Sequence, residues 1–253
     1  MSESDEIIAS LRDMVLHGPL RRAKEAGTPV ELSETFDFLS FALRRCRVSR
    51  SQMSQDLWVL YELADRKGGY FVEFGAGDGV VLSNTFLLET GYAWNGVLAE
   101  PNPVFHDALR RNRRAVISTD CIAGQSGETV TFNLTEDPHF STIDRYTAED
   151  GHAVLRASGT RIPVPTRSLT DLLRQANAPR RIDYLSIDTE GSEYEVLSAF
   201  DFKEYDVELL TVEHNHTPRQ QQLHVLLERN GFARKFPELS DFDAWYVNRR
   251  PPP

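Results

Sequence analysis

This chain of 253 residues contains a group of glycines, directly after an apolar stretch, that could take part in ligand chemistry. Gly75, Gly77 and Gly79 recur at alternate positions, directly after the β-type run Tyr70 to Phe74. Glycine lets the backbone take positive φ angles and lets a ligand lie against bare main chain. A strand, a glycine loop and then an apolar segment predict a cofactor-binding turn, followed at once by a helix over residues 81–92.

The spacing of these glycines argues against a dinucleotide fingerprint. That fingerprint reads G-x-G-x-x-G, and Val80 fills the position of its third glycine. The segment reads Glu-x-Gly-x-Gly-x-Gly instead, with Glu73 ending the strand. It resembles motif I of the class I methyltransferases, which bind S-adenosylmethionine. Such a loop suits a cationic amino-acid and ribose ligand better than a pyrophosphate.

Two acidic residues further along are placed to bind the rest of such a cofactor. Glu100 follows the short strand predicted at residues 96–99, about 20 positions beyond the glycine loop, where a carboxylate accepts both ribose hydroxyls. Asp120 follows the next strand, residues 115–119, and is a candidate for the adenine amino group.

Two later strands also end in polar residues. The apolar run 182–188 leads into Asp188-Thr-Glu190, and the run 207–212 leads into Glu213-His-Asn-His216. Open parallel sheets bind ligands at the carboxyl ends of their strands. If the strand order is that of a methyltransferase, both ends lie beside the glycine loop and surround the reacting groups.

The segments together resemble the FkbM-type methyltransferases over residues 51–248. The resemblance rests on Ser51-Gln-x-x-Gln-Asp56, Val72-Glu-Phe-Gly-Ala-Gly-Asp-Gly79, Ala99-Glu-Pro-Asn-Pro103, Ser141-Thr142, Ile187-Asp-Thr-Glu-Gly-Ser-Glu193 and Val212-Glu-His-Asn215. It implies S-adenosylmethionine as cofactor and O-methylation of a small molecule or glycan, with a sugar or polyketide-type hydroxyl as acceptor. The residues expected to bind the cofactor are Glu73, Gly75, Ala76, Gly77, Gly79, Asn84, Glu100, Pro101, Asp120, Cys121 and Asp188.

Methyl transfer to a hydroxyl requires a device that removes its proton, and two devices stay open. In the first, His214 or His216 acts as base and is oriented by Asp188 or Glu190. In the second, Mg²⁺ or Mn²⁺ lowers the pKa of the hydroxyl. The ligands of that cation would be Asp188, Glu213 and either Asn215 or His214.

The elements that position these residues indicate an α/β fold. The resemblance implies a Rossmann-like class I methyltransferase fold, with a mostly parallel seven-stranded sheet and helices on both faces, and the alternation of strands and helices agrees. Residues 232–236 and 242–248 predict an antiparallel closing hairpin, and residues 128–134 a strand inserted beside the sheet. Residues 135–160 lack periodicity and predict a disordered loop or a lid. In it, His139-Phe-Ser-Thr142 either reaches the site or is part of an ordinary surface loop.

We expect a methyltransferase domain at residues 51–250 behind a helical extension at residues 1–50. Apolar residues recur at helical spacing over residues 4–17, and Ser33 is placed to cap a second helix. The extension packs on the domain, or it shapes the acceptor pocket or a contact in a homo-oligomer.

Composition narrows the partners and the compartment. The net charge is −10, and residues 51–100 contain seven acidic and two basic residues, which disfavours nucleic acid near the glycine loop. Two cysteines are too few for a disulfide framework and favour the cytoplasm. We expect neither a signal peptide nor a membrane span.

Two other functions compete with methyl transfer. A nicotinamide-dependent oxidoreductase would use Glu100 equally well, although the glycine spacing disfavours it. A non-catalytic scaffold that binds S-adenosylmethionine would keep the fold and leave the polar strand ends without a role.

Overall fold

The computed structural model describes residues 34–147, 153–217 and 219–250. The chain divides into two compact units, Met1–Cys46 and Arg47–Pro253. In the first unit the described residues form the helix α3 (Glu34–Arg45), which agrees with the predicted second helix. The helix predicted over residues 4–17 lies outside the described residues. The division into a 1–50 extension and a 51–250 domain stays a prediction.

The second unit is built on a seven-stranded sheet with the strand order β10-β11-β9-β8-β1-β2-β3. The strands are β1 (Tyr70–Phe74), β2 (Asn95–Ala99), β3 (Val116–Ser118), β8 (Arg181–Ile187), β9 (Asp206–Glu213), β10 (Phe232–Lys235) and β11 (Asp243–Asn248). Neighbours from β3 to β9 pair in parallel, whereas β11 is antiparallel to both β9 and β10. The predicted parallel sheet with an antiparallel hairpin is therefore confirmed.

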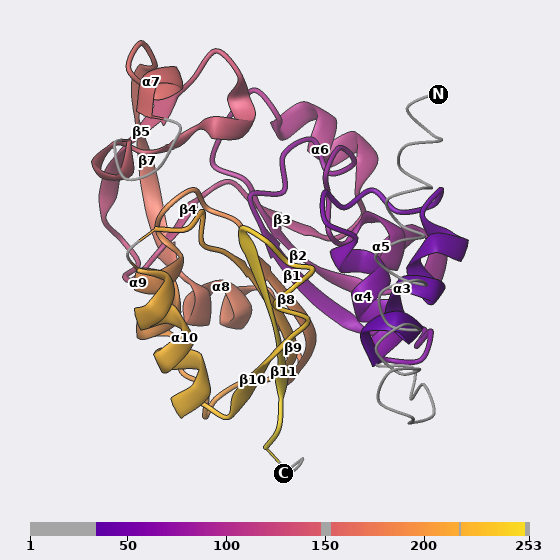
Figure 1. The fold of residues 1–253 in the computed structure, drawn as a ribbon. Helices are drawn as coiled ribbons and strands as arrows, with labels where there is room; N and C mark the ends of the chain where they lie inside the picture. The colour runs from indigo at the N-terminus through magenta and orange to yellow at the C-terminus, as the bar shows by residue number, and fades with distance from the viewer. Residues whose placement is uncertain (1–33, 148–152, 218, 251–253) are drawn as a thin grey trace, which may run out of the picture. The chain divides into compact units, whose positions relative to one another are not determined.

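Helices cover both faces of this sheet (Figure 1). They are α4 (Gln55–Glu62), α5 (Phe86–Tyr92), α6 (His106–Asn112), α8 (Leu169–Gln175), α9 (Glu193–Ala199) and α10 (Gln220–Arg229). On one face, Val72 and Phe74 of β1 join a buried core with α8, α9 and α10. On the other face, Trp58 of α4 stacks on Trp245 of β11, with ring centroids 5.3 Å apart. Side chains alternate across a strand, so a central strand such as β1 presents side chains to both faces.

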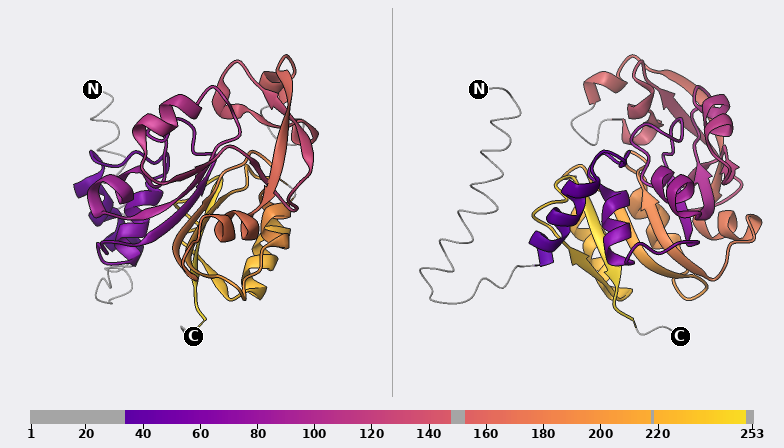
Figure 2. Two further views of the ribbon diagram at one scale, coloured as in Figure 1. Left: turned by 180° about the vertical axis from the view of Figure 1, so that it is seen from behind. Right: turned by 90° about the vertical axis from the view of Figure 1, so that its right-hand side faces the viewer.

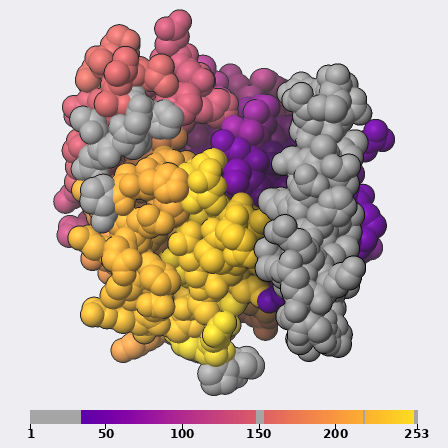
Figure 3. Space-filling view, viewed as in Figure 1, coloured from indigo at the N-terminus to yellow at the C-terminus, as the bar shows by residue number. Residues whose placement is uncertain are grey.

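The C-terminal hairpin closes one side of the sheet beside α10. Phe232 of β10 and Leu223 and Leu227 of α10 are buried in the same core. In the space-filling view the yellow hairpin lies next to the orange surface of α10 (Figure 3). Among the described helices, none has the length and apolar character that crossing a membrane requires.

The helix after the glycine loop begins at Phe86, later than predicted. The buried carboxylate of Glu73 accepts hydrogen bonds from the hydroxyls of Ser83 and Thr85 and from the backbone N–H of Asn84. These bonds hold the residues before Phe86 as a loop around the strand end. The predicted immediate start of the helix is therefore wrong, because a buried polar group dictates the local backbone.

A second sheet lies beyond the carboxyl ends of the main-sheet strands (Figures 1 and 2). It has the order β4-β7-β5-β6, with β4 (Cys121–Ala123), β5 (Thr129–Leu134), β6 (Thr142–Ile143) and β7 (Thr160–Ser168). The strand predicted at 128–134 belongs to this sheet and not to the edge of the main sheet. The segment predicted as a lid or loop contains η2 (Pro138–Phe140), η3 (Asp144–Tyr146) and α7 (Ala153–Arg156).

Candidate active site

The carboxyl ends of β1, β2, β8 and β9 meet at one cavity of about 400 Å³. Its lining includes Gly75 and Gly77 after β1, Glu100 after β2, and Asp188 and Glu213 at the ends of β8 and β9. Because β8 lies between β1 and β9, and β2 lies on the other side of β1, the four ends are neighbours. The sheet therefore brings together the polar strand ends that the sequence singles out.

Gly75 allows the loop to pass close to the end of β8. Its φ is +68°, and a Cβ at this position would collide with the backbone carbonyl oxygen of Asp188. A side chain is therefore excluded both by the left-handed backbone and by the neighbouring strand. The bare main chain at Gly75 and Gly77 forms part of the cavity wall.

Five residues predicted to bind the cofactor lie outside this lining: Glu73, Ala76, Gly79, Asn84 and Asp120. Glu73 is 3% exposed, and besides its loop partners it lies 3.5 Å from the guanidinium of Arg113. Asn84 donates its amide to the Ser186 hydroxyl at 2.9 Å. Glu73 and Asn84 therefore stabilise the loop that follows β1 without lining the cavity.

Glu100 faces the cavity and is only 5% exposed. One carboxylate oxygen accepts from the backbone N–H of Gly77 at 2.8 Å and the other from that of Asn102 at 2.7 Å. Burial raises the pKa of Glu100 to about 7, against the opposing effect of the two backbone hydrogen bonds. The carboxyl group therefore ties the glycine loop to the end of β2, and each oxygen still has a lone pair for a ligand hydroxyl.

Among the predicted cofactor-binding residues that follow β2 and β3, Pro101 and Cys121 line the cavity. Asp120 does not, because its carboxylate pairs with the guanidinium of Arg167 at 2.5 Å. The buried thiol of Cys121 has its pKa raised to about 12, chiefly by burial, so it is un-ionised at neutral pH.

Three carboxyl groups gather at the ends of β8 and β9. One oxygen each from Asp188, Glu190 and Glu213 lies within 4.8 Å of the others. Glu190 is held in the cluster by a backbone φ of +58° and by the guanidinium of Arg156 at 2.6 Å. Asn215 also lines the cavity.

Asp188 and Glu213 titrate as a pair. Burial raises the pKa of Asp188 to about 6, opposed by a hydrogen bond from Glu213. The pKa of Glu213 is raised well above its ordinary value by burial and by the charge of Asp188. The pair therefore binds a proton more tightly than an isolated carboxyl group does, and Glu213 hydrogen-bonds to Asp188 within it. Its Oε2 atom is buried without a hydrogen-bond partner in the described part of the chain.

Neither predicted histidine lines the cavity. The ring of His214 is buried, accepts from the backbone N–H of His216 at 3.2 Å and lies 3.2 Å from the amide of Gln220. Burial lowers the pKa of His214 to about 4. The side chain of His216 is 62% exposed and lies 3.3 Å from Asp241. The structure therefore brings the carboxylates to the cavity and turns both imidazoles away from it.

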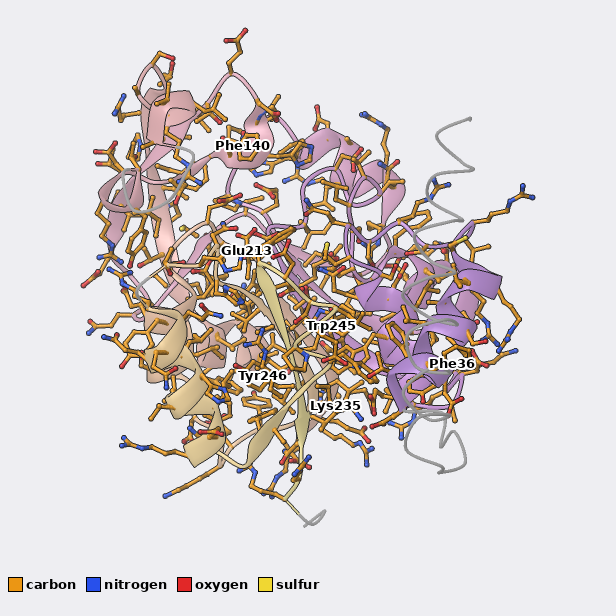
Figure 4. All side chains as sticks on the ribbon, viewed as in Figure 1. Phe36, Phe140, Glu213, Lys235, Trp245 and Tyr246 are labelled. Atoms are coloured by element: carbon orange, nitrogen blue, oxygen red, sulfur yellow. The ribbon has the colours of Figure 1, made fainter. Side chains whose placement is uncertain are left out.

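The second sheet supplies the opposite wall, which we call the roof, residues 138–141. All four of its residues line the cavity, including His139, whose ring lies 3.5 Å from an ideal Cβ on Gly77. In Figure 4, Phe140 on the roof lies above Glu213 at the end of β9. The sequence leaves open whether this segment reaches the site or is part of an ordinary surface loop, and its place in the cavity lining favours the first role.

Two side chains fix the roof. The side-chain amide of Asn102 donates hydrogen bonds to the carbonyl oxygen of Pro138 at 3.3 Å and to the hydroxyl of Ser141 at 3.2 Å. The fully buried Arg156 donates to the carbonyl of Phe140 at 2.8 Å as well as to Glu190. Sequence reasoning missed Arg156, because its partners are distant along the chain and no local pattern marks it.

A family model described as "Methyltransferase FkbM domain" matches residues 73–246, which is more than half of the chain. This chain belongs to the FkbM methyltransferase family. The match runs from the end of β1 to β11, so this FkbM domain includes both the main sheet and the second sheet. It is a methyltransferase of the S-adenosylmethionine-dependent class, which leaves no support for the nicotinamide alternative.

No curated protein matches the chain. Among solved structures, a precorrin-6y C5,15-methyltransferase from Geobacter metallireducens GS-15 is 14% identical with a TM-score of 0.41, covering 76% of this chain and 85% of that one. The delta-N METTL16 MTase domain is 12% identical with a TM-score of 0.40, covering 77% and 79%. At such distances neither structure bears on the acceptor or mechanism of this FkbM domain.

Proposed function

We propose that this FkbM domain transfers a methyl group from S-adenosylmethionine to a hydroxyl of a small molecule or glycan, a sugar or polyketide-type acceptor, in the cytoplasm. The observation that supports this proposal best is the carboxyl cluster of Asp188, Glu190 and Glu213, which shares one cavity with the glycine loop and Glu100. Homo-oligomerisation and the role of residues 1–50 stay predictions.

The donor would lie against the bare backbone of Gly75 and Gly77, with its ribose hydroxyls on Glu100. These three residues line the cavity together, and Glu100 has lone pairs free beyond its two backbone bonds. Its sulfonium would then face the carboxyl groups of Asp188 and Glu213, which offer the negative charge that a cation prefers.

Transfer is an in-line displacement at the donor's methyl carbon. A lone pair of the acceptor oxygen forms the new O–C bond, the electrons of the S–C bond pass to sulfur, and S-adenosylhomocysteine leaves. The hydroxyl proton passes to Asp188, whose pKa of about 6 keeps it ionised at neutral pH and able to accept. Glu213 orients that carboxylate through the hydrogen bond between them. The carboxyl pair suits the role of base better than the two histidines, which do not face the cavity.

The same cluster fits a divalent cation, the second device open from the sequence. Asp188, Glu190 and Glu213 present oxygen atoms at suitable mutual distances, and the unpartnered Oε2 of Glu213 is available as a ligand. Carboxylate and amide oxygens suit Mg²⁺ or Mn²⁺, and Asn215 supplies an amide nearby. A bound cation would lower the pKa of the acceptor hydroxyl.

Two measurements test the proposal. Isothermal titration with S-adenosylhomocysteine should show binding that Glu100→Ala abolishes. Transfer of labelled methyl groups to a panel of sugars and polyketide-type alcohols should be reduced about 100-fold or more by Glu213→Gln, with donor binding retained. Glu228→Gln is the control, since that exposed residue of α10 lies outside the cavity.

The possible outcomes separate the alternatives. Donor binding without transfer to any acceptor would support the non-catalytic scaffold. Intact turnover in Glu213→Gln would show that the carboxyl cluster has no catalytic role. Loss of turnover on chelation, restored by Mg²⁺ or Mn²⁺, would assign activation to a cation, whereas unchanged turnover would assign it to the carboxyl pair.

A further inference from the structure

Leu82 combines an unfavourable backbone with an exposed apolar side chain. Its φ is +58°, a left-handed conformation that a leucine rarely adopts. Its side chain lines the cavity, yet the residue is 46% exposed. Neither property contributes to a hydrophobic core, and strain that a protein retains is a reason to look for function.

The loop around Leu82 is fixed, so the exposure of its side chain is part of the fold. The Asp78 carboxylate accepts from the backbone N–H groups of Val80 and Val81, both at 2.8 Å. Ser51 forms a parallel bridge with Leu82. On the far side the Glu73 carboxylate holds the next residues, as described above. These contacts present Val81 and Leu82 together at the cavity.

The cavity lining combines carboxyl groups with exposed apolar side chains. Its carboxyl groups lie at the strand ends, and Glu100 is almost fully buried. Val81 and Leu82 are 53% and 46% exposed and lie toward solvent, on a lining that also includes the rings of Phe140 and Phe242. A ligand that fills this space would therefore meet both carboxyl groups and exposed apolar side chains.

We propose that Val81 and Leu82 form an apolar wall for the part of the acceptor that does not react, and that the acceptor is an amphipathic alcohol, a hydroxyl carried on an apolar body. This inference rests on the proposed function and narrows its acceptor class. It commits to a small ligand because the apolar wall is continuous with the lining that carries the carboxyl cluster. Burying apolar surface against such a wall favours binding in proportion to the area covered.

The test compares two probes that share all their sugar hydroxyls, methyl β-glucoside and octyl β-glucoside below its micelle concentration. Binding of each to the full chain saturated with S-adenosylhomocysteine is measured by isothermal titration. The octyl probe should bind at least about tenfold more tightly, because each buried methylene strengthens binding by roughly fourfold. Equal binding of both probes, or no binding of either, would overturn the inference.

Leu82→Asn locates the effect. Asparagine tolerates left-handed backbone better than leucine, so the melting temperature should not fall, while the preference for the octyl probe should drop about tenfold. Val81→Thr, nearly equal in shape, should reduce the preference in the same direction. Val104→Asn is the control, since Val104 is 64% exposed but lies outside the lining.

The remaining outcomes are also decisive. A preference unchanged in Leu82→Asn, or equally reduced in Val104→Asn, would contradict the proposed wall. Sedimentation velocity checks for another occupant: if the wild type self-associates and Leu82→Asn does not, the surface is a contact between copies and the inference fails. Absence of S-adenosylhomocysteine binding would instead refute the proposed function, before any comparison of the two glucosides.

Discussion

Replacing Gly75 with alanine tests whether close approach between the glycine loop and β8 is required. The variant has two costs. Left-handed backbone costs a non-glycine residue about 1–2 kcal/mol. The added methyl group would also collide with the Asp188 carbonyl oxygen, and overpacking of this kind typically costs about 1–3 kcal/mol more.

Gly127→Ala provides a matched control. Gly127 has φ of +83°, but an added Cβ would have no atom within 4 Å, so this variant has the backbone cost alone. Gly75→Ala should therefore melt about 2–12 °C below Gly127→Ala, the shift that about 1–3 kcal/mol produces in a chain of this size.

Differential scanning calorimetry of both variants measures this difference. Binding of S-adenosylhomocysteine should fall in Gly75→Ala and not in Gly127→Ala, because only Gly75 lines the cavity. Equal melting temperatures would refute the reasoning, since they would mean that the strand end moves aside without cost.

Three further predictions concern buried ionisable side chains. Arg156→Gln leaves the carboxylate of Glu190 without its guanidinium partner and should lower the free energy of unfolding by about 3–5 kcal/mol in urea titrations; Arg161→Gln, which breaks an exposed pair, should lower it by less than about 1 kcal/mol. Burial raises the pKa of Glu100 from 4.5 to about 7, so the folded chain binds the proton more tightly and the free energy of unfolding should fall as pH rises across that interval. Glu100→Gln should flatten this decline, and an unchanged slope in urea titrations between about pH 4.5 and about pH 7 would contradict it. His214→Ala should keep near wild-type methyl transfer, because its ring lies outside the cavity lining; a severe loss with intact folding by circular dichroism would restore that histidine as the base.

Local patterns predicted the main-sheet strands because these strands are apolar runs with clear ends. Tyr70–Phe74 is a strand with the predicted bounds, since glycines flank it on both sides. Ser168, a residue type that favours helix N-caps, caps α8, and its hydroxyl accepts from the N–H of Asp171. The polar strand ends become neighbours through the strand order, which the sheet pairings confirm. The strand bounds and the cap depend only on residues near one another in the chain, whereas the strand order is an expectation that comes from the resemblance to methyltransferases.

The structure departs from the sequence-based expectations where distant residues decide a side chain's direction. Glu73 has the spacing of a ligand-binding acid, but it turns toward the loop before α5 and toward Arg113. After β9 the backbone takes positive φ at Asn215 and His216, so strand alternation no longer indicates where these side chains point. The second sheet pairs β5 with β7 across a long intervening segment, which no local periodicity could show.

The separation between the main sheet and the second sheet also has a consequence for protein engineering. The backbone proposed to face the donor belongs to the turns after β1 and β2, whereas the roof belongs to a contiguous stretch between β5 and β6. Randomising residues 138–141 should therefore alter the wall opposite the strand ends while leaving the residues of the glycine loop and Glu100 themselves unchanged. Libraries confined to those four codons are small enough to screen completely.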